Sequence, residues 1–248
     1  MKRLYGLIGF PLGHSFSARY FADKFQQEHL PECEYRNFPL ESILELPAML
    51  ENHPELCGFN VTIPYKQEVI PYLTYLGGEA REIGAVNCVK ITPKGLFGYN
   101  TDAYGFQKSL LELIGNKRPD ALILGTGGAS KAVAYVLKKL GIPFSFVSRQ
   151  SGDNRLTYSE LTPEVMETHK LIINATPLGT FPKITGCPAI PYETLTPAHF
   201  LFDLVYNPAL TEFLRRGQEQ GAAIRNGYDM LIGQAEKAWE IWNTTSHE

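Results

Sequence analysis

A continuous apolar segment that runs directly into a glycine-rich loop constrains the fold of this chain most strongly. Residues 121–124 are apolar at every position, which is typical of a strand buried on both faces of a parallel sheet. Residues 125–130 (GTGGAS) follow at once, and a helical composition continues to Leu140, before Gly141. A strand, a glycine loop and a helix in this order form the context of a dinucleotide fingerprint. The segment therefore predicts an α/β fold with a parallel sheet.

The glycines of this loop suit the binding of a pyrophosphate. Gly125 allows a tight turn, and Gly127 lets the backbone approach a phosphate group that lies on the helix N-terminus. The third glycine position of the fingerprint is Ser130 in this chain. A turn without any ligand is the alternative interpretation, and the flanking strand and helix argue against it. The predicted cofactor-binding residues of the loop are Gly125, Thr126, Gly127, Gly128 and Ala129.

The end of the next predicted strand, residues 144–148, indicates which dinucleotide is bound. An NAD site has an acidic residue there to bind the ribose hydroxyls. This chain has Ser148 and Arg149 instead. A hydroxyl and a guanidinium suit a ribose 2′-phosphate, which an acidic side chain would repel. We therefore predict that Ser148 and Arg149 bind NADP, the alternative being an exposed loop arginine without a ligand.

Apolar runs alternate with helical patterns along the rest of the chain, as in strands joined by helices. The other expected strands are residues 4–8, 35–38, 59–62, 171–174 and 200–205, with a hairpin of 87–92 and 96–100 around a Pro-Lys-Gly turn. Helices are expected after a cap at Ser17, from Asp102 to about Ile114, after Asn207 and Pro208 as cap and first-turn proline, and over residues 229–243. The polar, breaker-rich stretch 115–120 separates two strand series.

Composition excludes several classes of partner. The chain has 248 residues and a formal net charge of −3, which argues against a nucleic-acid or anionic-membrane surface. The N-terminal apolar run is too short for a signal peptide, and no stretch reaches the length of a membrane span. Four widely spaced cysteines suggest neither a zinc site nor a disulfide framework. We expect a cytoplasmic protein with reduced thiols, no metal and a small-molecule substrate.

A lysine and a carboxylate at predicted strand ends form a candidate acid/base pair. Lys66 ends the run of residues 60–66 (NVTIPYK), and Asp102 follows Asn100 and Thr101. Hydride transfer to a ketone creates an alkoxide, and a well-placed general acid that protonates it contributes roughly 10²- to 10⁴-fold. Most lysines are solvated surface charges, and Lys66 taken alone would be one of them. The nucleotide loop downstream makes the pair Lys66 and Asp102 a catalytic candidate.

These residues resemble the motifs of the shikimate dehydrogenases, and the resemblance extends over nearly the whole chain. The similar segments, in chain order, are residues 9–17, 60–66, 84–87, 98–102, 174–179, 203–208 and 226–234. The resemblance implies an N-terminal α/β substrate domain and a Rossmann-type NADP-binding domain, with a C-terminal helix returning to the first. The implied boundaries are 1–102, completed by 227–248, and 103–226. It also implies a cleft between the domains that opens and closes.

The resemblance further implies an NADP-dependent oxidoreductase that interconverts 3-dehydroshikimate and shikimate, in the chorismate route to aromatic amino acids. Lys66 would be the acid/base residue and Asp102 its partner. The implied substrate-binding residues are Ser15, Ser17, Thr62, Asn87, Asp102, Tyr206 and Gln234. Thr176, Leu204 and Gly227 are implied on the cofactor side. Neutral hydroxyls and amides suit a small polyhydroxylated acid. A monomer or a homodimer is expected, and His14 is expected to be a structural loop residue.

Two segments depart from the pattern of the family. Residues 18–21 (ARYF) stand where a proline and a histidine-asparagine pair are commoner. Residues 148–150 (SRQ) replace the usual asparagine-arginine-threonine run, and a second basic residue is missing unless Arg155 serves. The second departure leaves the strictness of NADP selection open.

The sequence leaves two alternative functions open. A relative that accepts quinate or uses both cofactors is close in kind, although Ser15, Ser17 and Thr62 favour shikimate. A binding or regulatory protein that keeps the fold without catalysis is of another class. An intact pair of Lys66 and Asp102 argues against that alternative, since a binding protein has no need of it.

Overall fold

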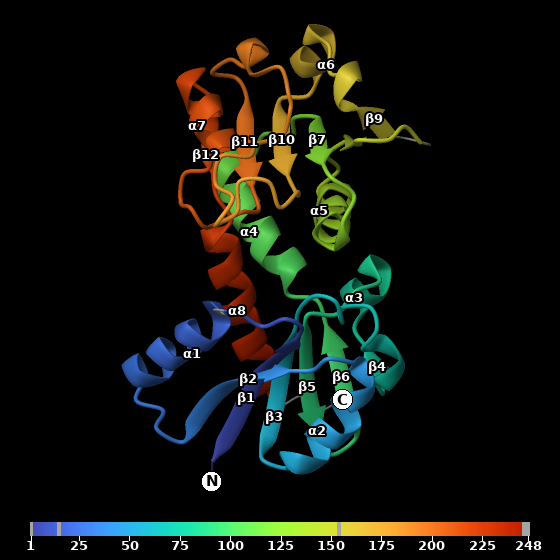
Figure 1. Cartoon of the computed structure of the whole chain (residues 1–248), viewed down its shortest axis with the longest axis vertical. Helices are drawn as coiled ribbons and strands as arrows, with labels where there is room; N and C mark the ends of the chain where they lie inside the picture. Colours follow the sequence, from blue (N-terminus) through green and yellow to red (C-terminus); the bar gives the residue numbers. More distant parts are fainter. Residues whose placement is uncertain (1, 14–15, 153–154, 245–248) are drawn as a thin grey trace. The chain divides into compact units, whose positions relative to one another are not determined.

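The structure is a computed structural model that describes residues 2–13, 16–152 and 155–244. It divides the chain into two compact units (Figure 1). The first unit contains the residues up to Thr101 and those from Ala235 onward, and the second runs from Asp102 to Gln234. The last helix, α8 (Tyr228–Asn243), therefore contributes residues to both units.

The first unit is built on a six-stranded mixed sheet with the order β2-β1-β3-β5-β6-β4. Its strands are β1 (Arg3–Gly9), β2 (Cys33–Pro39), β3 (Leu56–Val61), β4 (Tyr75–Leu76), β5 (Cys88–Thr92) and β6 (Gly95–Tyr99). The first three strands pair in parallel, whereas β5 is antiparallel to both β3 and β6. The predicted hairpin is thus confirmed, and Gly95 adopts a positive φ of 119° in its turn.

Helices α1 (Phe16–Gln27), α2 (Leu46–Asn52) and α3 (Gly78–Ile83) complete this unit together with the C-terminal part of α8. An aromatic cluster joins α1 and α8 to the sheet. Trp242 stacks on Tyr5, with ring centroids 4.9 Å apart, and its indole N–H donates to the Val89 carbonyl at 2.9 Å. Phe21 is fully buried beside them. The predicted return of the last helix places these apolar side chains in the core of the first unit.

The second unit contains a six-stranded, all-parallel sheet with the order β12-β11-β10-β7-β8-β9. Its strands are β7 (Ala121–Leu124), β8 (Phe144–Ser148), β9 (Arg155–Thr157), β10 (Leu171–Asn174), β11 (Phe200–Asp203) and β12 (Ala223–Arg225). Read from β9, the strands follow the 3-2-1-4-5-6 order of the Rossmann fold. Figure 1 shows β7, β10 and β11 side by side at the centre of this sheet.

The helices of the second unit are α4 (Asp102–Ile114), α5 (Gly128–Lys139), α6 (Pro163–Thr168), α7 (Glu212–Glu219) and the first part of α8. Helix α4 has the predicted bounds, and it buries Phe106, Leu110 and Ile114 at helical spacing. Gly141 has a φ of 67° just beyond α5, where the sequence predicts a helix stop.

Three local predictions were wrong. Ser17 is the second residue of α1 and does not cap it. Asn207 and Pro208 do not start a helix, because α7 begins at Glu212 with Thr211 as its N-cap. Strand β11 ends at Asp203, two residues early, because the Asp203 carboxylate accepts the Val205 N–H at 3.0 Å and turns the chain away from the sheet.

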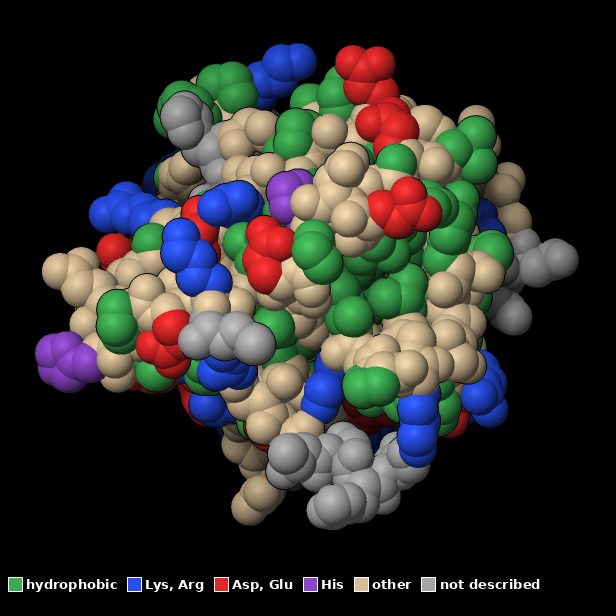
Figure 2. All heavy atoms as spheres, turned by 90° about the horizontal axis from the view of Figure 1, so that it is seen from below, with side chains coloured by type: hydrophobic (Ala, Val, Ile, Leu, Met, Phe, Trp, Pro, Cys, Tyr) green, Lys and Arg blue, Asp and Glu red, His purple; other side chains and the backbone are tan. Residues whose placement is uncertain are grey.

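The surface carries no single dominant sign of charge on the face drawn in Figure 2, where basic and acidic side chains are interspersed. Within the part of the chain that the structure describes, no helix combines the length and the apolar character that crossing a bilayer requires.

Candidate active site

Three motif segments of the first unit are joined by backbone hydrogen bonds where β3, β5 and β6 meet the loops. The turn that carries Lys66 follows β3, and its Lys66 carbonyl accepts the Val86 N–H at 2.7 Å. The Val61 N–H donates to the Asn87 carbonyl at 2.9 Å. The asparagine segment therefore holds the lysine turn at two points, at the start of the turn and at Lys66 itself.

Asn87 also binds the end of β6. Its Oδ1 accepts the Thr101 N–H at 2.6 Å, and its Nδ2 donates to the Thr101 hydroxyl at 3.0 Å. Both residues are buried. Asn100 Nδ2 donates to the Ala85 carbonyl at 3.0 Å, which ties the same two segments a second time. The chain immediately before Asp102 is thus fixed to the asparagine segment.

The loop after β1 packs on Thr62. The Thr62 N–H donates to the Ile8 carbonyl at 2.9 Å, and the Phe10 N–H donates to the Ile63 carbonyl at 3.1 Å. A Cβ placed on Gly9 would lie 2.4 Å from Thr62 Cγ2, so only glycine allows this approach. The structure therefore brings the predicted substrate loop and Thr62 together.

Ser17 belongs to a buried polar chain that leads to the start of the lysine motif. Its side chain hydrogen-bonds to Tyr35, and the Tyr35 hydroxyl donates to Asn60 Oδ1 at 2.8 Å. Burial raises the pKa of Tyr35 well above its ordinary value, so the phenol stays neutral. Asn60 Nδ2 donates in turn to the Asn87 carbonyl at 3.1 Å. This network links Ser17 to the segments that carry Thr62 and Asn87.

The remaining predicted residues differ in exposure and in the unit that holds them. Lys66 and Thr62 are half-buried in the first unit. Asp102 is half-buried and is the first residue of α4 and of the second unit. Gln234 is buried in α8, where its Nε2 donates to the Leu231 carbonyl at 3.0 Å, and Tyr206 is exposed. Ser15 and His14 lie outside the described residues.

The nucleotide loop has the backbone that a phosphate-binding turn needs. Gly125 adopts a φ of 101°, which side chains with a Cβ rarely tolerate. Its N–H donates to the Val147 carbonyl at 2.9 Å. Gly127 is the N-cap residue of α5, and the Ser130 hydroxyl donates to its carbonyl at 2.6 Å. Ser130, at the third glycine position, therefore secures the first turn of the helix.

Predicted cofactor residues lie at or just beyond the carboxyl ends of β7, β8, β10, β11 and β12, along one edge of the parallel sheet. Beyond β7, Gly125 lies against Thr176, whose Cγ2 is 3.0 Å from a Cβ placed on the glycine. Beyond β11, Leu204 contacts Gly227 so closely that a Cβ on the glycine would lie 2.2 Å from the Leu204 carbonyl oxygen. In open α/β sheets, ligands bind at this edge, where the strand order reverses. Here the reversal is between β7 and β10, where Gly125 meets Thr176.

Ser148 and Arg149 lie at the end of β8. The Ser148 hydroxyl accepts the Gln150 N–H at 3.4 Å, and Arg149 is exposed. Burial raises the pKa of Tyr158, and the positive charge of Arg149 opposes that rise, which places the guanidinium near the phenol. Arg155, the other basic residue considered from the sequence, begins β9 opposite Phe146.

Two functional candidates were missed by the sequence reasoning. Asn174 and Asp203 end the central strands β10 and β11, and both are fully buried. Burial raises the pKa of Asp203 to about 6, although three hydrogen bonds oppose the rise. A polar residue that ends an otherwise apolar strand was the available signal, since such residues meet at the edge where ligands bind.

A separate hollow of about 400 Å³ in the first unit is lined by Arg3, Lys90, Lys94 and Trp242, among others. None of the predicted site residues lines it. Its Lys90 donates to the Thr244 carbonyl, next to the end of α8, which is a favourable position for a cation.

Among the described residues, no cluster of three or more histidine, cysteine or acidic side chains is suited to a metal ion.

Comparison with known proteins gives a consistent result. A model of the shikimate dehydrogenase substrate binding domain matches residues 7–89. The shikimate dehydrogenase (NADP(+)) of Clostridium beijerinckii is 38% identical over 252 residues, which cover 96% of this chain and 91% of that protein.

Two solved structures are similar over almost the full chain. Shikimate 5-dehydrogenase from Thermus thermophilus, in complex with NADP(H) and shikimate, has a TM-score of 0.84 and 30% identity, covering 97% of this chain and 93% of that one. Quinate dehydrogenase from Corynebacterium glutamicum, in complex with NAD, has a TM-score of 0.86 and 27% identity, covering 98% and 94%.

Proposed function

The chain belongs to the shikimate dehydrogenase family, and on that premise we propose that it interconverts 3-dehydroshikimate and shikimate with NADP as the cofactor. It is an oxidoreductase that acts on a CH–OH group. The reaction is a step of aromatic amino acid biosynthesis, and we place it in the cytoplasm, in a monomer or a homodimer. The first unit carries most of the substrate-binding residues, and the second carries the NADP site.

The glycine loop suits a dinucleotide. Cβ atoms placed on Gly127 and Gly128 meet none of the described atoms within 4 Å, which leaves an open surface beside the loop. Helix α5 begins there, and Gly127 provides no side-chain cap for its first amides. A first turn without a side-chain cap, together with the helix dipole, favours a pyrophosphate. Bound NADP supplies the acceptor or donor of the hydride.

The end of β8 supplies the selectivity for NADP. Arg149 is exposed, so its guanidinium is accessible to a 2′-phosphate without the cost of burying an unpaired charge. Ser148 adds a hydroxyl next to it. An acidic residue, which would favour NAD, is absent from this strand end.

Lys66 and Asp102 carry out the proton transfer that accompanies hydride transfer. In the direction of reduction, the Lys66 ammonium protonates the carbonyl oxygen of 3-dehydroshikimate as hydride reaches the carbon. In the reverse direction, the neutral amine accepts the hydroxyl proton. Asp102 orients the ammonium and accepts a hydrogen bond from a ring hydroxyl. A positioned acid of this kind contributes roughly 10²- to 10⁴-fold to the rate.

The observation that carries this assignment is the hydrogen bonding of Asn87. Its carbonyl holds the start of the lysine turn, and its side chain holds Thr101, the neighbour of Asp102. The two proposed proton-transfer residues thus belong to segments that share one buried anchor. Precise placement of such groups is what converts a lysine into a general acid.

The substrate is held by neutral groups. We assign Ser15, Ser17, Thr62, Asn87, Tyr206 and Gln234 to its carboxylate and ring hydroxyls, together with Asp102. Hydroxyl and amide groups both donate and accept, which suits a ligand with several hydroxyls. The buried network of Ser17, Tyr35 and Asn60 keeps one of these hydroxyls oriented.

A direct assay tests the proposal. Purified protein, confirmed as folded by circular dichroism, is mixed with shikimate and NADP+ at mildly alkaline pH, and NADPH absorbance is followed. We expect one NADPH per shikimate oxidised until equilibrium. A folded protein that forms no NADPH would favour a binding or regulatory role. Faster turnover of quinate would favour the second candidate, a quinate dehydrogenase, because one structural relative is an enzyme of that kind.

A further inference from the structure

Asp203 is a buried carboxylate that three neutral groups bind at the end of β11. Its Oδ1 accepts the side-chain amide of Asn174 at 3.0 Å and the Val205 N–H at 3.0 Å. Its Oδ2 accepts the Thr211 hydroxyl at 2.6 Å. The side chain is fully buried. Burying a carboxylate is costly unless hydrogen bonds satisfy it, so the side chain is held firmly by these three partners.

One of these partners, Asn174, is bound at both ends of its amide. Nδ2 donates to Asp203, while Oδ1 accepts the N–H of Thr176 at 3.0 Å and its hydroxyl at 2.6 Å. An ionised carboxylate can only accept hydrogen bonds, so Asp203 requires the amide to present Nδ2. The opposite orientation would set the NH₂ group against the Thr176 N–H. Asp203 thereby fixes which way Asn174 points, and Asn174 fixes Thr176.

Thr176 lies directly against the nucleotide loop. Its Cγ2 would be 3.0 Å from a Cβ placed on Gly125. Its hydroxyl also accepts the Leu178 N–H at 3.3 Å, so the turn after β10 depends on the same side chain. A rotation of Thr176 would therefore change the surface that faces Gly125.

We propose that Asp203 is a positioning residue for the cofactor, which holds Thr176 against Gly125 through the side chain of Asn174 and so sets the affinity for NADP. The inference rests on the proposed function, because it takes Thr176 and Gly125 as cofactor residues. Asp203 acts through Asn174 and takes no part in proton transfer.

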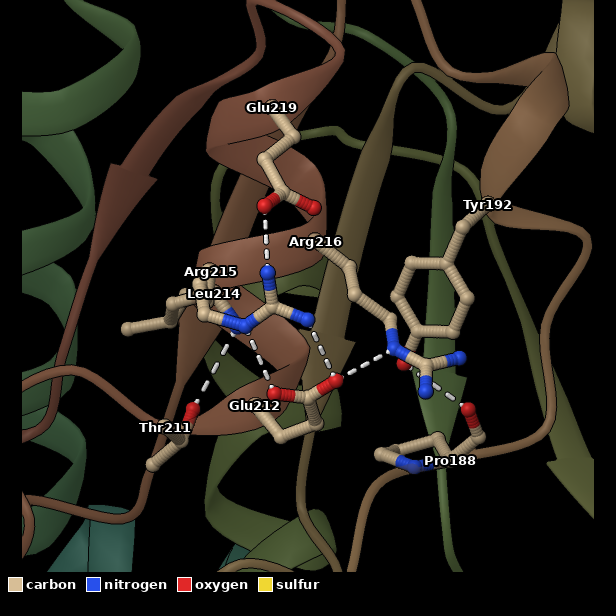
Figure 3. Close-up of polar contacts among 8 residues, drawn as sticks. All are labelled: Pro188, Tyr192, Thr211, Glu212, Leu214, Arg215, Arg216 and Glu219. Atoms are coloured by element: carbon tan, nitrogen blue, oxygen red, sulfur yellow. Dashed lines mark hydrogen bonds and ion pairs between the residues drawn. The ribbon is translucent and has the colours of Figure 1, made fainter. Parts of the chain in front are cut away.

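The same carboxylate also makes a structural hydrogen bond, to Thr211. The test must separate this bond from the one to Asn174. The Thr211 hydroxyl donates to Asp203. The same hydroxyl accepts the Leu214 N–H at 3.4 Å, as the N-cap of α7 (Figure 3). Thr211→Val removes only the hydrogen bond to Thr211, whereas Asn174→Ala removes the one that leads to the cofactor loop. Asp203→Ala removes both.

The experiment measures the dissociation constant of NADP+ by calorimetric titration, with steady-state kinetics beside it. We expect Asp203→Ala and Asn174→Ala each to weaken NADP+ binding roughly tenfold, the scale of a lost buried hydrogen bond to a charged group. The KM for NADP+ should rise by a similar factor, with little change in kcat or in the KM for shikimate. Asp203→Asn should stay within about threefold, because its amide can accept from Asn174 and donate to Thr211.

A double-mutant cycle tests whether the effect passes through Thr176. In a Thr176→Val background, Asp203→Ala should weaken NADP+ binding far less than in the wild type, since coupled residues are non-additive. Two controls should lower the Tm without changing NADP+ affinity. They are Thr211→Val and His199→Phe, which removes another buried side chain hydrogen-bonded within the same unit.

The possible results distinguish a failure of the inference from a failure of the proposed function. Wild-type NADP+ affinity in folded Asp203→Ala or Asn174→Ala would overturn the inference, and so would full additivity with Thr176→Val. If Asp203→Ala does not fold, Asn174→Ala decides the question alone. A wild-type protein that binds NADP+ but oxidises no shikimate would contradict the proposed function and leave the inference standing. Failure of the wild type to bind NADP+ would overturn both.

Discussion

Asn87 and Thr101 are joined at both ends of the asparagine amide, by a 2.6 Å bond to the Thr101 N–H and a 3.0 Å bond to its hydroxyl. Both side chains are buried, so the bonds are shielded from water. The next residue along the chain is Asp102. The position of Asp102, one proposed catalytic group, thus depends on the side chain of Asn87. The backbone carbonyl of Asn87 also anchors the turn that carries the other proposed group, Lys66.

Replacement of Lys66 by alanine should lower kcat by roughly 10²- to 10⁴-fold, because the proton path is lost. Shikimate binding should change much less, since the hydroxyl and amide ligands remain. Stopped-flow or steady-state rates, with a binding titration of shikimate, measure both quantities. Lys108→Ala is the matched control, because Lys108 is an exposed lysine on α4 and should behave as the wild type. An unchanged kcat in Lys66→Ala would rule out the assigned role.

Arg149→Ala should raise the KM for NADP+ about tenfold or more and leave the KM for NAD+ almost unchanged. A charge-assisted hydrogen bond contributes roughly 1.5–3 kcal/mol, and only NADP carries the phosphate that receives it. Arg118→Ala, in the breaker-rich connection before β7, provides a control of the same charge change. Equal effects on the two cofactors would show that Arg149 does not contact the 2′-phosphate.

Two glycines predicted on the cofactor side should respond differently to alanine. At Gly227 the new Cβ would lie 2.2 Å from the Leu204 carbonyl oxygen, so Gly227→Ala should destabilise the fold by about 1–3 kcal/mol. At Gly128 the Cβ has open space among the described atoms, so Gly128→Ala should leave the Tm unchanged and weaken NADP+ binding by occupying the cofactor surface. Thermal unfolding and NADP+ titration of both variants check the contrast. A Gly128→Ala protein with wild-type NADP+ affinity would remove that residue from the site.

The buried carboxylate of Asp203 should make stability depend on pH in a defined window. Its pKa is raised from 3.8 to about 6 in the fold, so the folded state binds more protons between these values. The free energy of unfolding should therefore fall as pH rises from about 4 to 6, by roughly 3 kcal/mol for this group.

Asp203→Asn removes the titration and is the reference. Urea unfolding of both proteins from pH 4 to 7 isolates the contribution of this one group, because the other titrating groups, such as His199, are common to both. A difference between the two proteins that stays constant with pH would contradict the raised pKa.

Much of the fold could be predicted from the sequence, where local signals agree with the tertiary structure. Strand β7 and helix α4 have the predicted bounds, because an apolar run between breakers and a helical period with a glycine beyond it leave few alternatives. The glycine loop was found for the same reason. Its place at the reversal between β7 and β10 follows from the strand order, which no local pattern contains.

The wrong predictions lie where side chains far apart in sequence decide the local structure. Asn207 and Pro208 resemble a helix start, yet Thr211 caps α7, and it is held there by Asp203 eight residues earlier. Ser17 resembles a cap but hydrogen-bonds to Tyr35 on β2. Such partners become neighbours only once the chain has folded.

The candidate site, like the fold, could be predicted only in part. Lys66, Thr62 and Asn87 were recognised as motif residues, and the structure adds the hydrogen bonds that join their segments. Asn174 and Asp203 were quoted within motifs but given no role, because a single asparagine or aspartate at a strand end has many explanations. Their contact across adjacent strands, at 3.0 Å, is the observation from which we infer a positioning role.

The most direct test of the account is a comparison of kcat/KM for shikimate and quinate, each with NADP+ and with NAD+. We predict the highest value for shikimate with NADP+, with a loss of at least about tenfold when either the substrate or the cofactor is exchanged, the scale of one lost charge-assisted contact. Comparable values for quinate, or a preference for NAD+, would contradict the assignment of the chain as an NADP-dependent shikimate dehydrogenase.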